Sequence, residues 1–403
     1  MSLGRHFYRV PLAAPYWNGA TYQRILRSLC SGRIVDGADL DDLRFQIMER
    51  LGIREAVLCG SGSLALEIAL RSCEVRRGDE VVIPAFCCTA VVPPIVAVGA
   101  TPVLADAGDE LNLTVETVNA VLTQKTKAII VPHLFGNPAD ISAIIELARD
   151  KHVRVIDDAA QALGATLVGR PVGTFGDAGI LSFGNAKVCF GLGGGVVVFR
   201  REGFLTEAGK FDLAPALLLP VLQRFLSTLL CHRWRRWTLP LQKATSRKRS
   251  QDPGVLPASY PNECMANLYA AVAYSLMLTL SENIAARRAR VGAYQELLGE
   301  VAGLRLIAHG AGSACLTQVV RVLPTRNGRD LAADVIKALG RVGYEIQGSY
   351  VPIHLLENFA NCVWDRLPHA ERVWTDLVEL PCEPGVRLGH VERIATIVKE
   401  TLY

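Results

Sequence analysis

The 403-residue sequence predicts an α/β protein with a large domain built on a mostly parallel, seven-stranded sheet and a smaller α+β C-terminal domain. Short β-branched runs alternate with stretches of helical periodicity from about residue 54 to 200. Each run is continuously apolar, which is typical of a strand covered by helices on both faces. The seven runs are EAVLC, EVVIP, TPVLAD, KAIIVP, VRVIDD, GILSF and GGVVVF.

Helical periodicity fills the intervals and the C-terminal part. SLALEIALRSC and PADISAIIELARDK have helical spacing, and Asp140 is a suitable N-cap for the second. Residues 266–299 predict one long helix or two abutting helices. Strand-like LTQVVRVLP, helix-like DLAADVIKALGRV and a final helix near 390–402 follow. We therefore divide the chain into an N-terminal arm (1–25), a large domain (26–212), an apolar-basic insertion (213–250), and a long helix with the small domain (251–403).

Composition limits the function classes. Half of the residues are hydrophobic, a fifth are charged and the net charge is only +4, which indicates a globular protein and gives no support to nucleic-acid binding. The 11 cysteines include no CxxC pair or other zinc-ligand spacing, so we expect no metal site and a reducing compartment. The N-terminus lacks the apolar core of a signal peptide, and we expect a cytoplasmic protein.

The insertion at 213–250 has an unusual composition. No acidic residue occurs between Leu213 and Gln251, and Pro215, Pro220 and Arg224 interrupt its apolar part, which argues against a membrane-spanning helix. Two interpretations stay open. The segment is either a helix that packs on the domain followed by a solvated basic loop, or a peripheral contact with the inner face of the membrane. Its basic residues are Arg224, Arg233, Arg235, Arg236, Lys243, Arg247, Lys248 and Arg249.

Several short segments suit a phosphate-bearing cofactor. CGSGSLALEIAL (59–70) places a Gly-Ser-Gly-Ser turn between a strand and a helix, where N–H groups and hydroxyls bind an anion or merely cap the helix. VIDDAAQALGA (155–165) ends a buried strand with Asp157 and Asp158, of which a cap needs only one. In VPHLFGNPADI (131–141), His133 alone is more typical of a structural histidine.

The stretch ILSFGNAK (180–187) places Lys187 five residues after Ser182. Its neighbours are apolar, an unusual setting for an ammonium group, and they are Phe183, Val188, Cys189 and Phe190. A desolvated amine is favoured in its neutral form, which a Schiff-base lysine requires. The sequence therefore favours a nucleophilic lysine over a solvated surface charge.

Together these segments resemble the DegT/DnrJ/EryC1/StrS family of sugar aminotransferases, from about residue 20 to the C-terminus. The matching motifs occur in the family's order. They are SGSLALEIAL, DEVVIPAFCCTAVVPPIVAVGATPVLAD, PHLFGNPADI, DDAAQALGA, SFGNAK, NECMANLYAAVAYS, SYVPIH and LPHAERVWTDLVELPCEP. The resemblance implies the type I aminotransferase fold, pyridoxal 5'-phosphate as cofactor and a homodimer.

The resemblance also implies site residues. Lys187 would form a Schiff base with the cofactor and then act as general base and acid, and Asp158 would pair with the pyridine nitrogen. Gln161 would lie near the phenolic oxygen. The phosphate would be held by Gly62, Ser63, the Leu64 N–H and the Ser182 hydroxyl in one subunit and by Asn262 of the other.

The sequence departs from the family at three of these places. Cys88 stands where an aromatic residue usually stacks on the ring, and Cys264 replaces the arginine that usually follows the asparagine. Gly193 stands where an acidic residue is common. These changes leave cofactor binding expected and bear on substrate choice.

Three functions stay open. The first is transfer of an amino group, by family habit from glutamate, to a keto group on a nucleotide-linked sugar. The second has a lipid-linked or cyclitol ketone as acceptor at the membrane surface, and the third is a cofactor-binding homologue without turnover. Dehydratases of the family carry histidine at the position of Lys187, so the lysine argues against that activity.

Overall fold

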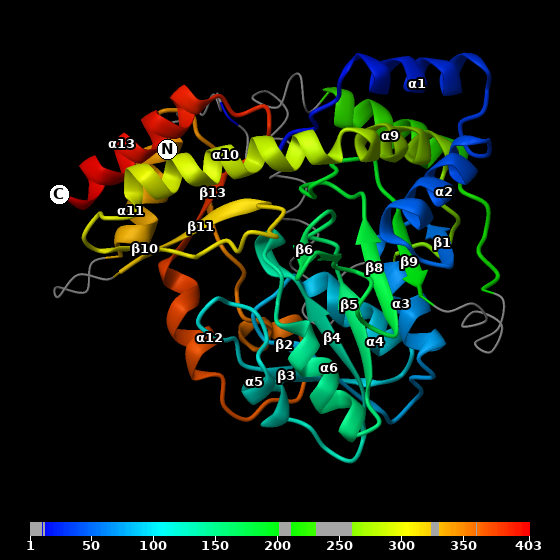
Figure 1. The fold of residues 1–403 in the computed structure, drawn as a ribbon, viewed down its shortest axis with the longest axis horizontal. Helices are drawn as coiled ribbons and strands as arrows, with labels where there is room; N and C mark the ends of the chain where they lie inside the picture. The colour runs from blue at the N-terminus through cyan, green and yellow to red at the C-terminus, as the bar shows by residue number, and fades with distance from the viewer. Residues whose placement is uncertain (1–9, 11–12, 201–210, 231–259, 324–329, 360) are drawn as a thin grey trace.

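The large domain of the computed structural model is a three-layer α/β sandwich (Figure 1). The structure describes residue 10 and residues 13–200, 211–230, 260–323, 330–359 and 361–403. Seven strands form the central sheet in the order β1-β9-β8-β5-β4-β2-β3, and only β9 runs antiparallel to its neighbours. The predicted fold class is therefore confirmed. The strands are β1 (Glu55–Cys59), β2 (Glu80–Pro84), β3 (Thr101–Ala105), β4 (Thr126–Pro132), β5 (Arg154–Asp158), β8 (Ala178–Ser182) and β9 (Gly195–Phe199).

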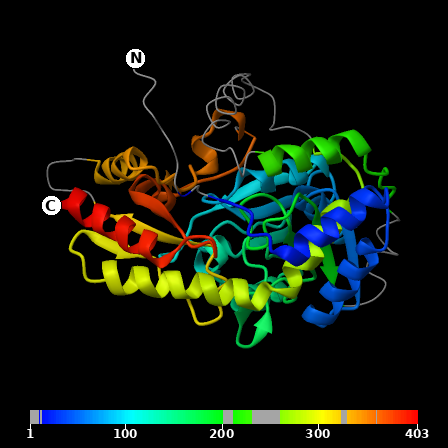
Figure 2. The same cartoon turned by 90° about the horizontal axis from the view of Figure 1, so that it is seen from above.

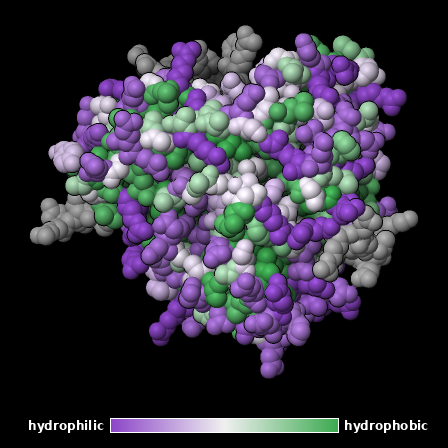
Figure 3. All heavy atoms as spheres, in the orientation of Figure 1, coloured by the Kyte–Doolittle hydropathy of each residue, from purple (hydrophilic) through white to green (hydrophobic). Residues whose placement is uncertain are grey.

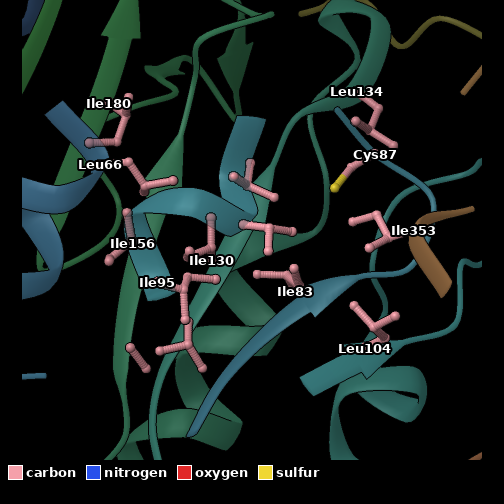
Figure 4. Packing of buried hydrophobic residues seen from close by; sticks show 14 of the residues in the cluster. Leu66, Ile83, Cys87, Ile95, Leu104, Ile130, Leu134, Ile156, Ile180 and Ile353 are labelled. Atoms are coloured by element: carbon pink, nitrogen blue, oxygen red, sulfur yellow. The ribbon is translucent and has the colours of Figure 1, made fainter. Parts of the chain in front are cut away.

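Helices cover both faces of this sheet because alternate strand residues point to opposite sides. Ile83, Ile130 and Ile156 pack on one face with α3 and α4, as Figure 4 shows at close range. Their neighbours Val82 and Ile129 pack on the other face. The large-domain helices are α1 (Gly19–Cys30), α2 (Asp39–Leu51), α3 (Gly62–Ser72), α4 (Val92–Ala97), α5 (Val115–Asn119), α6 (Ile141–Asp150) and α9 (Asn267–Leu278).

The structure defines the ends of two of the predicted helical regions. Asp140 caps α6 through a bond from the Ala143 N–H to its Oδ1 (3.4 Å). Residues 266–299 form two helices, α9 and α10 (Leu280–Leu298), which meet at Thr279. Figures 1 and 2 show α10 extending from the large domain to the small one. A small hairpin of β6 (Thr166–Leu167) and β7 (Arg170–Pro171) completes the large domain.

The small domain is an antiparallel sheet in the order β10-β11-β13-β12, packed against α10, α11 and α13. Helix α1 crosses the predicted border at residue 25, and residues 1–9 and 11–12 of the predicted arm lie outside the described residues. The remaining elements are β10 (Leu304–Leu306), β11 (Thr317–Val322), α11 (Leu331–Arg341), β12 (Gln347–Gly348), α12 (Pro368–Val373), β13 (Leu377–Pro381) and α13 (Leu388–Leu402).

The described part of the apolar-basic insertion contains a helix at residues 218–230, and its residues 231–250 lie outside the described part. Val221, Phe225 and Thr228 are buried on one side of this helix, so it packs on the domain. None of the described helices combines the length and hydropathy needed to cross a membrane. The face of the molecule in Figure 3 mixes hydrophilic and hydrophobic residues.

Glu379 in β13 has a buried carboxyl group in the small-domain sheet. It accepts hydrogen bonds from Ser349 Oγ (3.0 Å) and Gln347 Nε2 (3.3 Å). Burial nevertheless raises the pKa of Glu379 to about 7, because those two bonds only partly replace water around the charged form.

This raised pKa predicts a pH-dependent loss of stability. The folded state holds the proton that the unfolded state releases near the ordinary pKa, so the stabilising contribution is complete at low pH and is lost as pH rises through about 7. The total loss is about 3 kcal/mol at most. We expect Glu379→Gln to remove it.

Urea unfolding of both proteins between pH 5 and 8.5 measures the effect. The difference in unfolding free energy between variant and wild type should grow in favour of the variant with rising pH. A constant difference would contradict the prediction.

Candidate active site

The carboxyl ends of the parallel strands and the N-terminus of α3 meet around one cavity. Ligands of open α/β sheets bind at this edge. β4 contributes Pro132, β5 contributes Asp158 and β8 contributes Ser182. The full lining is Ser61, Gly62, Ser63, Leu66, Cys87, Cys88, Ala90, Val91, Pro132, Asp158, Ala160, Gln161, Ile180, Ser182 and Lys187.

One end of the cavity is suited to an anion. Ser61 is the N-cap of α3, and its Oγ accepts the Leu64 N–H (3.1 Å). The N–H groups of Gly62 and Ser63 belong to the first helical turn, where no intrahelical acceptor exists, and the helix dipole is positive there. A Cβ on Gly62 would lie 3.1 Å from Ser182 Oγ. The glycine therefore lets this hydroxyl approach the helix end closely.

The acidic residue of the cavity is Asp158, the second of two adjacent aspartates. Asp158 is buried and its Oδ1 accepts the Ala160 N–H (2.9 Å). Burial raises the pKa of Asp158, while the Ala160 N–H and the nearby Lys187 and His133 oppose the rise. A positively charged partner in the cavity would remove much of this cost of burying the carboxylate.

Asp157 points to the other side of the sheet and has a structural task. Its Oδ1 lies 2.7 Å from His133 Nε2, and its Oδ2 accepts the Phe175 N–H (2.8 Å). His133 Nδ1 accepts the Ala139 N–H (2.9 Å), so Nε2 carries the proton and donates it to Asp157. Both side chains are fully buried. The interpretation of His133 as a structural histidine agrees with this geometry.

Lys187 reaches the cavity from the turn between β8 and β9. Its apolar neighbours Phe183, Val188 and Cys189 are buried in the core between the sheet and α9 rather than around the amine. Ala186, directly before it, has a positive φ of 57°. This conformation is costly for a residue with a side chain and is held only where the surroundings fix it. Lys187, the next residue, lines the cavity.

Two other predicted residues lie apart from the cavity. The Leu64 N–H is already bound to Ser61, and Leu64 does not line the cavity. Asn262 is exposed, and its Nδ2 donates to the Asp212 carbonyl (3.2 Å). Next to it, the Glu263 carbonyl accepts the Gly60 N–H (2.8 Å). Asn262 therefore lies on the outer side of the turn that precedes α3.

Comparisons with known proteins agree with this arrangement. Residues 17–399 match the model of the DegT/DnrJ/EryC1/StrS aminotransferase family. The chain belongs to this family. It is 27% identical to the GDP-perosamine synthase of Caulobacter vibrioides, over 98% of both chains. It is 30% identical to the UDP-N-acetyl-3-dehydro-alpha-D-glucosamine 3-aminotransferase of Acidithiobacillus ferrooxidans, over 92% of both chains. The structure resembles the aminotransferase TlmJ of Streptoalloteichus hindustanus with a TM-score of 0.77 and 25% identity, over 98% of both chains.

The protein is thus a pyridoxal-phosphate-dependent aminotransferase of the DegT/DnrJ/EryC1/StrS family. The residues around the cavity fit this cofactor. The N–H groups of α3 and the hydroxyls suit its phosphate, a buried carboxylate suits its pyridine nitrogen, and an amine suits its aldehyde. Cys88 is half-buried and lines the same cavity, at the place where the family resemblance implies a residue stacked on the ring.

Some residues of the aminotransferase cavity were not singled out from the sequence. Ser61 belongs to the Gly-Ser-Gly-Ser turn, and its role as N-cap follows from that position. Pro132 is the last residue of β4, so the strand prediction could have included it, whereas Ile180 lies in the middle of β8. Leu66, Cys87, Ala90, Val91 and Ala160 carry no chemical signal in the sequence.

Because Asp157 and Asp158 have different partners, we expect substitution by asparagine to have different effects at the two positions. Asp157→Asn replaces one oxygen by an N–H donor, so the Phe175 N–H or the His133 Nε2–H loses its acceptor. We expect a loss of about 1–3 kcal/mol in the unfolding free energy of the cofactor-free protein. Asp158→Asn still accepts the Ala160 N–H, so its stability should stay within about 0.5 kcal/mol of wild type, while its affinity for pyridoxal 5'-phosphate should fall.

Urea unfolding without cofactor and absorbance titration with cofactor separate the two effects. Equal destabilisation by both substitutions would refute this division of roles.

Proposed function

We propose that this aminotransferase moves an amino group from glutamate to a keto group on a nucleotide-linked sugar. The observation that carries the proposal is the convergence of Lys187, Asp158 and the N-terminus of α3 on one cavity. The names of the two relatives refer to GDP- and UDP-linked sugars, and both relatives match this chain over nearly its whole length.

In this proposal Gly62, Ser63 and Ser182 hold the phosphate of the cofactor. Leu64 contributes only if its N–H leaves the Ser61 Oγ and donates a hydrogen bond to the phosphate instead. Asp158 keeps a proton on the pyridine nitrogen, and burial in the cavity strengthens that charge–charge contact. Gln161 lies beside the phenolic oxygen, and Cys88 contacts the ring face. When bound, pyridoxal 5'-phosphate supplies an electron sink for the carbon that carries the amino group.

Lys187 has two tasks in the proposed reaction. Its Nζ would hold the aldehyde of the bound cofactor until the amine of the donor replaces it there. The Nζ would then act as general base and acid, taking a proton from the amino-bearing carbon of the donor and returning one at the neighbouring position. With the keto sugar, the Nζ would move these protons in the opposite direction.

The donor half-reaction tests this proposal. We expect cofactor-loaded protein to convert L-glutamate to one equivalent of 2-oxoglutarate, with a change in the cofactor's visible absorption. Borohydride reduction before the donor is added should fix the cofactor on the peptide that contains Lys187, as mass spectrometry detects. Lys187→Ala should abolish both results, and Lys151→Ala, an exposed lysine, should preserve them.

No change with glutamate or any other amine donor would favour the homologue without turnover. After glutamate loading, a panel of nucleotide-linked keto sugars, cyclitol ketones and lipid-linked keto sugars identifies the acceptor. Amination of a cyclitol or lipid-linked ketone alone would replace the nucleotide-linked sugar in the proposal.

We also propose that the active form is a homodimer in which Asn262 of each chain reaches the phosphate site of the other. Asn262 is exposed in the single chain and lies outside its own cavity, as such a role requires. Cys264 follows two residues later and is half-buried, so it does not offer the charge that an arginine would bring there.

A second proposal concerns the leucines of helix 218–230. Leu219, Leu226 and Leu230 are 64%, 50% and 52% exposed, and their spacing places them on the face opposite buried Val221 and Phe225. Figure 2 shows this helix as a green outer element of the molecule. We propose that these leucines, which we name the leucine face, contact an anionic membrane peripherally. The eight basic residues and the lack of acidic ones in this segment support that choice. A cytoplasmic enzyme would then work at the inner face of the membrane.

Flotation with phosphatidylcholine–phosphatidylserine vesicles tests the leucine face. We expect the wild type to float and the triple substitution of Leu219, Leu226 and Leu230 by serine to stay at the bottom, while light scattering reports a dimer for both. The matched control is serine at Leu278 and Leu388, which are exposed elsewhere. A wild type that does not float refutes membrane contact, and a triple variant that becomes monomeric assigns the leucine face to the contact between copies.

A further inference from the structure

Gln161 has a fixed orientation at the edge of the active-site cavity. The side chain is buried, and its Oε1 accepts the Phe135 N–H (3.1 Å). Because a backbone N–H can only donate, the oxygen of the amide must face Phe135. The Nε2 group, with two donor hydrogens, therefore faces the remaining surroundings. Those surroundings are the cavity and Tyr350. Burial raises the pKa of Tyr350 well above its ordinary value, and its phenol group is close enough for the Gln161 amide to lower that pKa.

Tyr350 comes from the small domain, in the segment that follows β12. Its ring stacks on Phe135 (6.0 Å between centroids, 24° between planes) and meets Phe86 edge-on (5.9 Å, 72°). Phe86 and Phe135 are buried, and they belong to the large domain. After Tyr350, the Ile353 N–H donates to the Ala85 carbonyl (2.8 Å), which anchors this segment beside Phe86.

The turn that presents the Phe135 N–H is itself held by the small domain. Phe135 has a positive φ of 58°, a conformation that needs outside support in a residue with a bulky side chain. Its carbonyl accepts the Leu316 N–H (2.9 Å), and the Gly136 carbonyl accepts the Ala314 N–H and Ser313 Oγ–H (2.8 Å each). A Cβ on Gly136 would lie 2.7 Å from the Leu316 nitrogen, so only glycine permits this approach.

Both ends of the Gln161 amide thus depend on small-domain contacts. Its oxygen is fixed through the turn that residues 313–316 support, and its nitrogen faces the cavity and Tyr350, whose ring is stacked on Phe135 of the same turn. We propose that Tyr350 is a positioning residue that aims the second Nε2 hydrogen of Gln161 at the phenolic oxygen of the cofactor. The inference rests on the proposed function, in which Gln161 lies beside that oxygen.

The chemical consequence concerns the basicity of the bound cofactor. A donor at the phenolic oxygen stabilises its anionic form and so lowers the pH at which the cofactor linked to Lys187 loses its proton. Without the Tyr350 hydroxyl, the Gln161 amide gains freedom to turn from the cavity. The bound cofactor should then hold its proton to higher pH.

Tyr350→Phe is the direct test, because it keeps the ring that stacks on Phe135 and removes only the hydroxyl. The measurement is the midpoint of the pH titration of the cofactor's visible absorption, followed without any substrate. We expect the midpoint to rise by roughly half to one pH unit, the effect of one weakened hydrogen bond. Gln161→Ala should raise it further.

The double variant separates positioning from an independent effect. If Tyr350 acts through Gln161, adding Tyr350→Phe to Gln161→Ala should leave the midpoint unchanged. The matched control is Tyr344→Phe, another small-domain tyrosine, whose hydroxyl faces His390 Nδ1 (3.1 Å), and it should leave the wild-type midpoint in place. Thermal unfolding of each variant checks the fold.

Two results would overturn the inference. One is a Tyr350→Phe midpoint equal to wild type, and the other is an equal shift by Tyr350→Phe with and without Gln161. A wild type that shows no covalent cofactor at Lys187 would instead be a failure of the proposed function, so the two failures are distinguishable.

Discussion

The pleat of β5 at its carboxyl end is the constraint on which the active site depends. Adjacent residues of a strand point to opposite faces, so Asp157 and Asp158 cannot share a task. Asp157 is satisfied inside the protein by His133 and the Phe175 N–H, which offsets the cost of burying its charge. Asp158 keeps one oxygen for the cavity because, among the described residues, its carboxylate accepts a backbone hydrogen bond only from the Ala160 N–H, at Oδ1.

The His133–Asp157 hydrogen bond also supports the turn that lies beside the cavity. His133 begins the segment in which Phe135 adopts its positive φ, and that segment supplies the N–H that orients Gln161. The buried pair therefore links a strand end, a strained turn and a cofactor-facing amide in one continuous set of contacts. A polar network of this kind is stable only when every member has a partner, which explains why the histidine is held at both nitrogens.

Much of the large domain was predictable because its signals are local. Seven continuous apolar runs identify seven buried strands, and motifs at strand ends then fall on one edge by topology alone. The break at Thr279 was left open, because residues 266–299 have helical periodicity on both sides of it. Tyr350 belongs to the matched motif SYVPIH, but no role was predicted for it. It reaches Gln161 across a large separation in the chain and from another domain, and no local pattern encodes such a contact.

The apolar neighbours of Lys187 show that adjacent residues in the sequence do not determine the surroundings of a side-chain amine. Phe183, Val188 and Cys189 are buried in the core, and Phe190 is half-buried. Which side a side chain takes in a turn depends on the backbone, and the residue before Lys187, Ala186, has a positive φ. The five-residue spacing from Ser182 gave the more useful signal, since Ser182 and Lys187 both line the cavity.

The departure at Gly193 connects the active-site turn to the helix at 218–230. Gly193 has a φ of 148°, and a Cβ there would lie 3.2 Å from the Tyr269 ring and 3.4 Å from Arg224 Nε. A longer side chain would have to displace that ring or the guanidinium. Arg224 belongs to the helix and also lowers the pKa of Glu263, which burial otherwise raises. Since Glu263 adjoins Asn262 and its carbonyl holds the Gly60 N–H, the insertion contacts the segment that leads into the phosphate turn. Glycine at position 193 thus leaves room for the Tyr269 ring and for Arg224 of the helix at 218–230 beside the active-site turn.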